Sequence, residues 1–321
     1  MSDDDDVFLE EAAGSEWTPP PEVRLHNGER IPVDSDFFHA PPSGLGEIVS
    51  AQSTLIESKH PLSMSVRMML IVGVSGAVLF GVAAAVPLFA PGPDASTLGY
   101  FFGVLAALAT LGCVIYFTRF KHTCNYVGKA GIAEYRLSGS RDASPKAKVL
   151  LFEDCYDVTT WQLRQYVNGV YSGTQYKHIW RDAEGDELFA LKGSFRSEQG
   201  TPKAVSPFWF AIAAEGHWNE FAFDRMVKDF ESQGHLDFRV NRKDMVRVGP
   251  GFLELTFGGK TTRLTPEDIK TLSIANGSFT IHTKEARWFS SKGKFGFEYG
   301  GMGNAKLFLF SLERLAGYTF S

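Results

Sequence analysis

Residues 68–90 read MMLIVGVSGAVLFGVAAAVPLFA, and residues 98–118 read LGYFFGVLAALATLGCVIYFT. Both stretches are uncharged and mostly apolar, and each exceeds the ~20 residues with which a helix crosses a hydrocarbon core of about 30 Å. Two such runs with only seven residues between them are hard to bury inside a soluble domain of this size. The sequence therefore predicts a transmembrane helical hairpin over residues 65–119, with spans at 68–90 and 98–118.

The charges that flank the hairpin predict its orientation. Lys59 and Arg67 precede the first span, Arg119 and Lys121 follow the second, and the connection between the spans holds only Asp94. Because cytoplasmic flanks carry the excess of Lys and Arg, we expect both termini to face the cytoplasm. The three cysteines show neither a disulfide framework nor zinc-site spacing, which fits a reducing compartment. The start of the chain has no pattern of a cleavable signal peptide.

Small residues recur at every fourth position of both spans, which lets helix backbones approach closely. They are Gly73, Ala77, Gly81, Gly99, Gly103 and Ala107. We favour packing of the two spans against each other, and the alternative is an interface between copies in a homo-oligomer. Neither span contains a charged residue or a histidine, so we do not expect transport by this chain alone.

Charge is distributed unevenly along the 321 residues, whose net charge is −5. The first 62 residues carry 13 acidic and 3 basic side chains, whereas residues 120–321 carry 27 basic and 23 acidic ones. Residues 1–42 include the run Asp3–Asp6 and six prolines, a composition that buries too little apolar surface to offset chain entropy. We therefore expect a disordered cytoplasmic tail over residues 1–42 and an amphipathic juxtamembrane helix within residues 43–64.

Beyond residue 120 the sequence alternates apolar and polar residues between glycine-rich turns, as antiparallel strands do. This region is also similar to itself. Residues 127–134 (VGKAGIAE) resemble residues 248–255 (VGPGFLEL), and residues 146–154 (KAKVLLFED) resemble residues 260–268 (KTTRLTPED).

A third similarity has a spacing of 85 residues. Phe210, Ile212, Gly216, Asn219, Phe223, Val227 and Phe230 correspond to Phe295, Phe297, Gly301, Asn304, Phe308, Leu312 and Leu315. The pattern predicts a last strand, a glycine turn, an asparagine helix cap and a helix whose apolar face packs on the sheet. We therefore expect two units, at residues 120–234 and 235–321, each built of antiparallel strands and closed by one C-terminal helix.

A small barrel or bent sheet closed by a C-terminal helix is the plan of pleckstrin-homology domains. Residues 65–321 resemble bacterial membrane proteins in which pleckstrin-homology-like (PH-like) domains follow two transmembrane helices, most clearly at LELTFGGKTTRLTPEDIKTLSI (253–274) and GKFGFEYGGMGNAKLFLFSLERLAG (293–317). The insertion between Phe152 and Lys192 departs from a minimal domain of this kind. The resemblance implies an α+β fold, with a transmembrane hairpin followed by two tandem PH-like units. It also implies a bacterial inner membrane, and binding or scaffolding in place of catalysis.

Catalytic motifs are missing from the sequence, which has no GxSxG, HExxH, P-loop or paired CxxC pattern. Glu215, His217 and Glu220 come nearest to a metal cluster, and we interpret them as capping and surface residues of a strand-to-helix turn. We therefore expect no enzymatic activity, no cofactor and no metal ion.

Two groups of cations are candidate contacts for anionic lipid. They are Arg141, Lys146 and Lys148 in the first unit, and Lys292 and Lys294 in the second. A basic residue near an anionic leaflet contributes ~1 kcal/mol of attraction. The alternative is solvated loops, which we favour because Asp142 interrupts the first group. Nucleic-acid binding is not expected, because no basic stripe is sustained.

Three functional hypotheses follow. The first is a non-enzymatic membrane protein whose paired cytoplasmic units bind a protein partner and act as a scaffold. The second is sensing of anionic lipid by the same units. The third and least favoured is an enzyme with its site between the units, which would require His178, Glu215 or His217 beside a carboxylate in a deep pocket.

Overall fold

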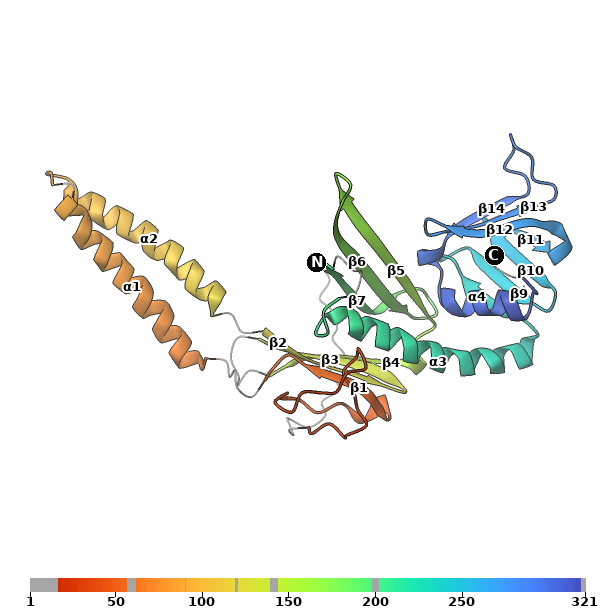
Figure 1. Cartoon of the computed structure of the whole chain (residues 1–321), viewed down its shortest axis with the longest axis horizontal. Coiled ribbons are helices and arrows are strands. Elements are labelled where there is room, and N and C mark those ends of the chain that lie inside the picture. The colour runs from red at the N-terminus through yellow and green to blue at the C-terminus, as the bar shows by residue number, and fades with distance from the viewer. Residues whose placement is uncertain are drawn as a thin grey trace.

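The computed structural model describes residues 17–56, 62–89, 91–118, 121–138, 144–197 and 202–318. Two long apolar helices, α1 (Met64–Phe89) and α2 (Ala95–Phe117), form a hairpin that stands apart from the rest of the molecule (Figure 1). Both are long and apolar enough to cross a membrane, and little of their surface is covered by the rest of the chain. The predicted hairpin is thus confirmed as a pair of helices of the required length and composition.

The first antiparallel sheet has the strand order β1-β2-β3-β4. Its strands are β1 (Ile48–Ser53), β2 (Lys121–Gly128), β3 (Gly131–Ser138) and β4 (Lys146–Leu151). Strand β1 precedes the membrane helices in the sequence, yet it pairs with β2, which follows them. The hairpin is therefore inserted between two neighbouring strands of one sheet, and this sheet does not begin at residue 120 as we expected.

The amphipathic helix expected within residues 43–64 is corrected by this pairing. Residues 43–56 instead include a short 3-10 helix (Ser43–Leu45) and β1. The apolar spacing of the segment suits one face of a helix. An isolated helix of this length, however, is only marginally stable in water, whereas pairing with the edge of β2 satisfies the backbone hydrogen bonds of the segment. Ser50, Ala51 and Gln52 are buried in consequence.

Residues 17–42 also differ from the expected disordered tail, because they pack on one face of the first sheet. Val23, Phe37 and Leu45 are buried with Tyr126 of β2 and Tyr135 of β3. Trp17 stands edge-on to Phe37, with ring centroids 5.1 Å apart. These apolar residues are too sparse to show a period, but they are enough to cover one face of a sheet. The expectation for residues 1–16 lies outside the described residues.

A three-stranded antiparallel sheet follows, formed by β5 (Asp157–Val167), β6 (Val170–Arg181) and β7 (Glu187–Phe195). Helix α3 (Pro207–Gln233) closes this set of strands. It begins where the Ser206 side chain accepts a hydrogen bond from the backbone of Phe208, and it ends at Gly234, which has the left-handed conformation.

The same order of elements then occurs again. A four-stranded sheet of order β11-β10-β9-β8 is followed by the sheet β12-β13-β14 and by a helix. The bounds are β8 (Leu236–Arg239), β9 (Met245–Gly249), β10 (Phe252–Phe257), β11 (Lys260–Leu264), β12 (Ile269–Ala275), β13 (Ser278–Thr283), β14 (Lys294–Glu298) and α4 (Ala305–Arg314). We call β1–β7 with α3 the first unit, and β8–β14 with α4 the second unit.

Two of the three sequence similarities fall at equivalent places in these units. Residues 127–134 and 248–255 each form the turn between the second and third strands, and residues 146–154 and 260–268 each form the fourth strand with a one-turn 3-10 helix after it. The third similarity was wrong in register. Phe210 and Ile212 lie inside α3, whereas Phe295 and Phe297 lie in β14, because α3 begins well before Asn219 and is much longer than α4.

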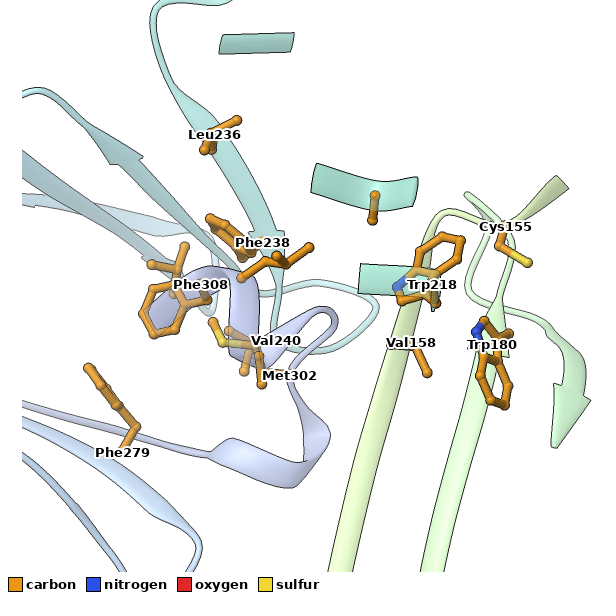
Figure 2. Packing of buried hydrophobic residues seen from close by; sticks show 14 of the residues in the cluster. Cys155, Val158, Trp180, Trp218, Leu236, Phe238, Val240, Phe279, Met302 and Phe308 are labelled. Atoms are coloured by element: carbon orange, nitrogen blue, oxygen red, sulfur yellow. The ribbon is translucent and has the colours of Figure 1, made fainter. Parts of the chain in front are cut away.

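One hydrophobic core joins the two units. Figure 2 shows Val158 and Trp218 of the first unit on one side of the junction, and Val240, Met302 and Phe308 of the second unit on the other. Because these side chains belong to a single buried cluster, the two units form one body.

Candidate functional site

Two close contacts hold the membrane hairpin together. Gly99 and Gly103 of α2 are buried against α1, and a Cβ atom at either position would lie 2.7 Å from the carbonyl oxygen of Ala83 or Leu79. At the end of the hairpin nearer the sheets, Arg67 Nε donates to Thr118 Oγ1 over 3.2 Å. By contrast, Gly73, Ala77 and Gly81 lie on the exposed side of α1, and Ala107 is half-buried.

Hydrogen bonds close the first sheet at the point where the hairpin leaves it. The backbone of Thr54 donates to the carbonyl of Thr123 over 3.0 Å, and the backbone of Thr123 donates to Thr54 Oγ1 over 2.9 Å. His122 Nδ1 lies 2.9 Å from the Thr54 carbonyl. We call this group of three residues the neck of the insertion.

The neck places one end of the first sheet beside the membrane helices. Only two residues separate Thr118 from Lys121, so the Cα atoms of these two residues are at most about 11 Å apart. Lys121 pairs with Ser138, and Arg136 pairs with Lys146. The ends of β2, β3 and β4 that lie beside the hairpin are therefore the ends that carry cations.

This basic end carries four exposed side chains, which are Lys121, Arg136, Lys146 and Lys148. Arg136 forms an ion pair of 2.5 Å with Glu134, and Lys148 Nζ lies 4.6 Å from the centre of the Phe189 ring. Lys146 and Lys148, two of the predicted lipid contacts, thus lie close to where α2 ends. Arg141, the third, lies outside the described residues.

The other predicted lipid contacts are in the second unit, away from the basic end. Lys292 pairs with Glu285 over 3.2 Å, and Lys294 Nζ donates to the carbonyl of Trp288 over 3.1 Å. Lys292 belongs to the loop between β13 and β14, and Lys294 is the first residue of β14. The structure therefore does not bring the two predicted groups of cations together.

A second polar cluster forms the junction of the units. The Asp157 side chain of β5 is buried and accepts hydrogen bonds from Arg239 of β8, with the Arg239 Nε atom 2.8 Å from Oδ2. Arg239 also donates to the carbonyls of Asp182 and Ala183. Burial raises the pKa of Asp157, and the positive charge and hydrogen bonds of Arg239 oppose that rise. A pocket of about 530 Å³ opens beside this pair, lined partly by Arg181, Arg242 and Glu298.

Asn304 joins the same junction from the second unit. Its side-chain oxygen accepts hydrogen bonds from the backbone of Val158 and from the Trp218 indole, over 3.1 and 2.8 Å. A Cβ atom at the neighbouring Gly303 would overlap the Asp157 carboxylate, so only glycine allows this close approach. Sequence reasoning treated Asn304 as a helix cap and missed this role, for which the sequence carries no local signal.

A buried ion cluster lies one helical turn before Trp218 along α3. Glu215 is 3.3 Å from His178 Nε2 and 2.9 Å from Lys306 Nζ of α4. Burial alone would raise the pKa of Glu215, but the hydrogen bonds and charges of His178 and Lys306 outweigh it, so the pKa is lowered. His217 and Glu220 pair separately on the exposed face of α3. These residues lie within the helix and not at the strand-to-helix turn that we expected.

The arrangement around Glu215 is a salt bridge between the units. His178 and Glu215 are adjacent, as the enzyme hypothesis required, but neither lines the junction pocket. The nearest candidate nucleophile of the junction, Cys155, is buried, and this burial raises the pKa of its thiol to about 12. Among the described residues, no group of three or more His, Cys, Asp or Glu side chains is placed to bind a metal ion.

Two exposed apolar features were also missed in the sequence. One is the far end of the β5–β6 ribbon, and the other is the Trp288–Phe289 pair in the loop between β13 and β14. The sequence signals were an uncharged stretch over residues 165–176 and a Trp-Phe pair after Arg287.

Comparison with known proteins gives no family: no family model matches the chain, and no curated protein is similar to it.

Proposed function

We propose that this chain is a non-enzymatic protein of a bacterial inner membrane, with both termini in the cytoplasm, that acts as a scaffold. In this proposal the first and second units are PH-like units, and together they bind a protein partner beside the bilayer. The order of a four-stranded sheet, a three-stranded sheet and a closing helix, which occurs twice, supports the PH-like assignment.

The insertion of the hairpin between β1 and β2 carries the proposal. A domain joined to its anchor by one flexible linker would sample many orientations. Here two chain connections leave the same end of one sheet, and hydrogen bonds at Thr54, His122 and Thr123 close it. The buried Asp157–Arg239 pair then couples the second unit to the first. Such an attachment suits a body that presents its surfaces in a fixed orientation to a partner.

Proximity labelling in intact cells tests the scaffold. A labelling enzyme fused to the C-terminus should enrich one protein, or a small set, above a control in which the same enzyme is fused to an unrelated two-span anchor at equal abundance. Equal labelling by both fusions would refute the scaffold. Labelling of proteins from the opposite side of the membrane would refute the proposed orientation.

A second function, contact with anionic lipid, is favoured by one observation. Lys121, Arg136, Lys146 and Lys148 are exposed at the end of the sheet that lies beside α2. A phospholipid head group with a negative charge would be attracted to this end by ~1 kcal/mol per cation.

The lipid test uses the full chain, because β1 precedes the hairpin and a fragment that begins at residue 120 would lack it. In nanodiscs of mixed zwitterionic and anionic lipid, the purified protein should retain anionic lipid in native mass spectrometry. The double variant Lys146→Gln and Lys148→Gln should retain less. Lys260→Gln is the matched control, because Lys260 begins the fourth strand of the second unit as Lys146 begins that of the first. Equal retention by all three proteins would exclude this function.

A further inference from the structure

The β5–β6 ribbon extends beyond the sheet to which it belongs. Strand β7 pairs with β6 only from Thr174 to Arg181, so residues 165–173 form a two-stranded tip without a third strand. A short two-stranded ribbon is marginally stable in water. This one nevertheless exposes Tyr166, Val167 and Val170, whose exposed fractions are 60, 61 and 65 %. No charged residue lies between Arg164 and Lys177.

The loop between β13 and β14 exposes a second apolar pair. The exposed fractions of Trp288 and Phe289 are 86 and 97 %. The loop is closed at its base, where the backbone of Thr283 donates to the carbonyl of Gly293 over 2.8 Å. In the sequence, cations flank the aromatic pair, namely Lys284, Arg287, Lys292 and Lys294, against the single acidic residue Glu285.

These two tips and the membrane hairpin project from the same side of the body, whereas the C-terminal end of α3 lies on the opposite side (Figure 1). We propose that the β5–β6 tip and the Trp288–Phe289 loop enter the head-group layer of the same bilayer that holds α1 and α2. The body would then lie against the membrane at three places. This inference rests on the proposed anchoring by α1 and α2, and it does not depend on a protein partner.

The chemistry of each tip suits that layer. Tyrosine and tryptophan concentrate at membrane interfaces, where one part of the side chain is in an apolar environment and the rest is hydrated. The cations of the loop would meet phosphate groups while Trp288 and Phe289 reach the acyl boundary. The tip of the ribbon carries no charged side chain, so no charge is desolvated when it enters this layer. Its unpaired edges, however, need hydrogen-bond partners, which the hydrocarbon core lacks, so the tip stops among the head groups.

The bilayer fits these tips better than a protein partner does. The two tips belong to different units and are separate in the sequence, yet they point the same way as the helices that fix the plane of the membrane (Figure 1). The neck restricts the distance of the first sheet from that plane, and the Asp157–Arg239 pair transmits this restriction to the second unit. A flat bilayer contacts separate tips at once, whereas a protein would need a matching surface for each.

The test measures the environment of a fluorophore at single cysteines of the full chain in nanodiscs. Val167→Cys and Phe289→Cys carry the label at the two tips, and Ser232→Cys, exposed in the last turn of α3, is the control on the opposite side. All three are made with Cys113→Ser, because Cys113 is the exposed one of the three cysteines. The wild-type chain labelled at Cys113 of α2 reports separately on the anchor.

We expect lipids with a nitroxide head group to quench the labels at residues 167 and 289, and iodide to quench them several-fold less than the label at residue 232. Equal quenching of all three labels by iodide would overturn the inference. Shielding from iodide that appears only at high protein density, without quenching by lipid, would identify contact between copies and also overturn it. If the label on Cys113 were not quenched by lipid, the anchoring itself would fail, which is a distinguishable result.

Discussion

The two units differ most at the connection between their first two strands. In the second unit, β8 and β9 are joined by a tight turn, in which the backbone of Val240 donates to the carbonyl of Asp244 and Asn241 Oδ1 accepts two further bonds. In the first unit, the membrane hairpin occupies the same place between β1 and β2. A turn at the end of a strand pair therefore tolerates a long insertion, provided that the chain leaves and re-enters the sheet at adjacent residues.

The largest expected effect comes from giving the first unit the connection of the second. Replacing residues 57–120 with the sequence of Asn241–Asp244 should move the protein from the membrane fraction to the soluble fraction. Its β-rich circular dichroism and cooperative thermal unfolding should remain, because the new connection joins the chain just beyond the Thr54–Thr123 hydrogen bond that closes the first sheet. A longer Gly/Ser connection in place of Pro91–Asp94 is the control and should leave the protein in the membrane. Aggregation without a thermal transition would mean that the first unit needs its hairpin to fold.

Breaking the junction between the units should have the next largest effect. Arg239→Ala leaves Asp157, whose side chain is 2 % exposed, as an unpaired buried carboxylate, and should lower the free energy of unfolding by about 3–5 kcal/mol. Arg242→Ala is the matched control, because its pair with Asp186 is about 70 % exposed and should contribute less than about 1 kcal/mol. Denaturant titration in detergent measures both. Similar losses for the two variants would contradict the assigned role of Arg239.

A smaller effect concerns residues 17–42, which cover one face of the first sheet and have no counterpart in the second unit. His26 is buried beside Ser50 of β1 and the Phe210 ring, and burial lowers its pKa from 6.5 to about 3. Below pH 6.5 the unfolded chain binds a proton that the folded chain does not, so the stability falls as the pH decreases toward 3. The loss should be about 2 kcal/mol at pH 5, at 1.36 kcal/mol per pH unit.

His26→Gln removes this titration and keeps a side chain that can reach Ser50. Denaturant titrations at pH 7 and pH 5 should therefore show a fall in stability for the wild type that exceeds the fall for the variant by about 2 kcal/mol. The difference between the two pH values is the quantity to compare, because the substitution also changes packing. An equal fall in both proteins would show that His26 is not the responsible group.

The smallest effect lies within the hairpin itself. Gly103→Ala places a methyl group 2.7 Å from the Leu79 carbonyl oxygen, so α1 and α2 must separate, whereas Gly81→Ala meets no atom within 4 Å. Unfolding in mixed micelles should find Gly103→Ala less stable than Gly81→Ala by about 1 kcal/mol or more. Equal stabilities of the two variants would show that α1 and α2 do not make their close contact at Gly103 in the membrane.

Local patterns made part of the fold predictable. The hairpin was evident because its apolar composition alone indicates it. The turn at Gly128 and the 3-10 helix after β4 were recognisable because each is a short sequence pattern that recurs in the second unit. Strand β1 was missed because its partner β2 lies beyond two membrane spans, and because its apolar spacing fits a helix as well as a strand. Phe210 and Ile212 alternate as in a strand, although Ser206 and Pro207 begin a helix before them.

The candidate site was less predictable, because it depends on contacts between distant segments. Lys146 and Lys148 were chosen as cations near a loop, but their position beside the hairpin follows from the register of β3 and β4. Asp157, Arg239 and Asn304 come from separate elements, and no spacing in the sequence relates them. The sequence identifies Trp288 and Phe289 as an aromatic pair, but only the conformation of the loop shows that both side chains are exposed.

The insertion of the hairpin also orders events during synthesis. Ile48 of β1 leaves the ribosome before the two membrane helices, and its partner Gly128 leaves after them. At about 5–20 residues per second, β1 waits for several seconds without a partner strand. In that interval the spans can enter the bilayer while no sheet yet holds their ends. The first sheet can therefore close only on a chain whose membrane segments are already made, so its completion marks a correctly ordered assembly.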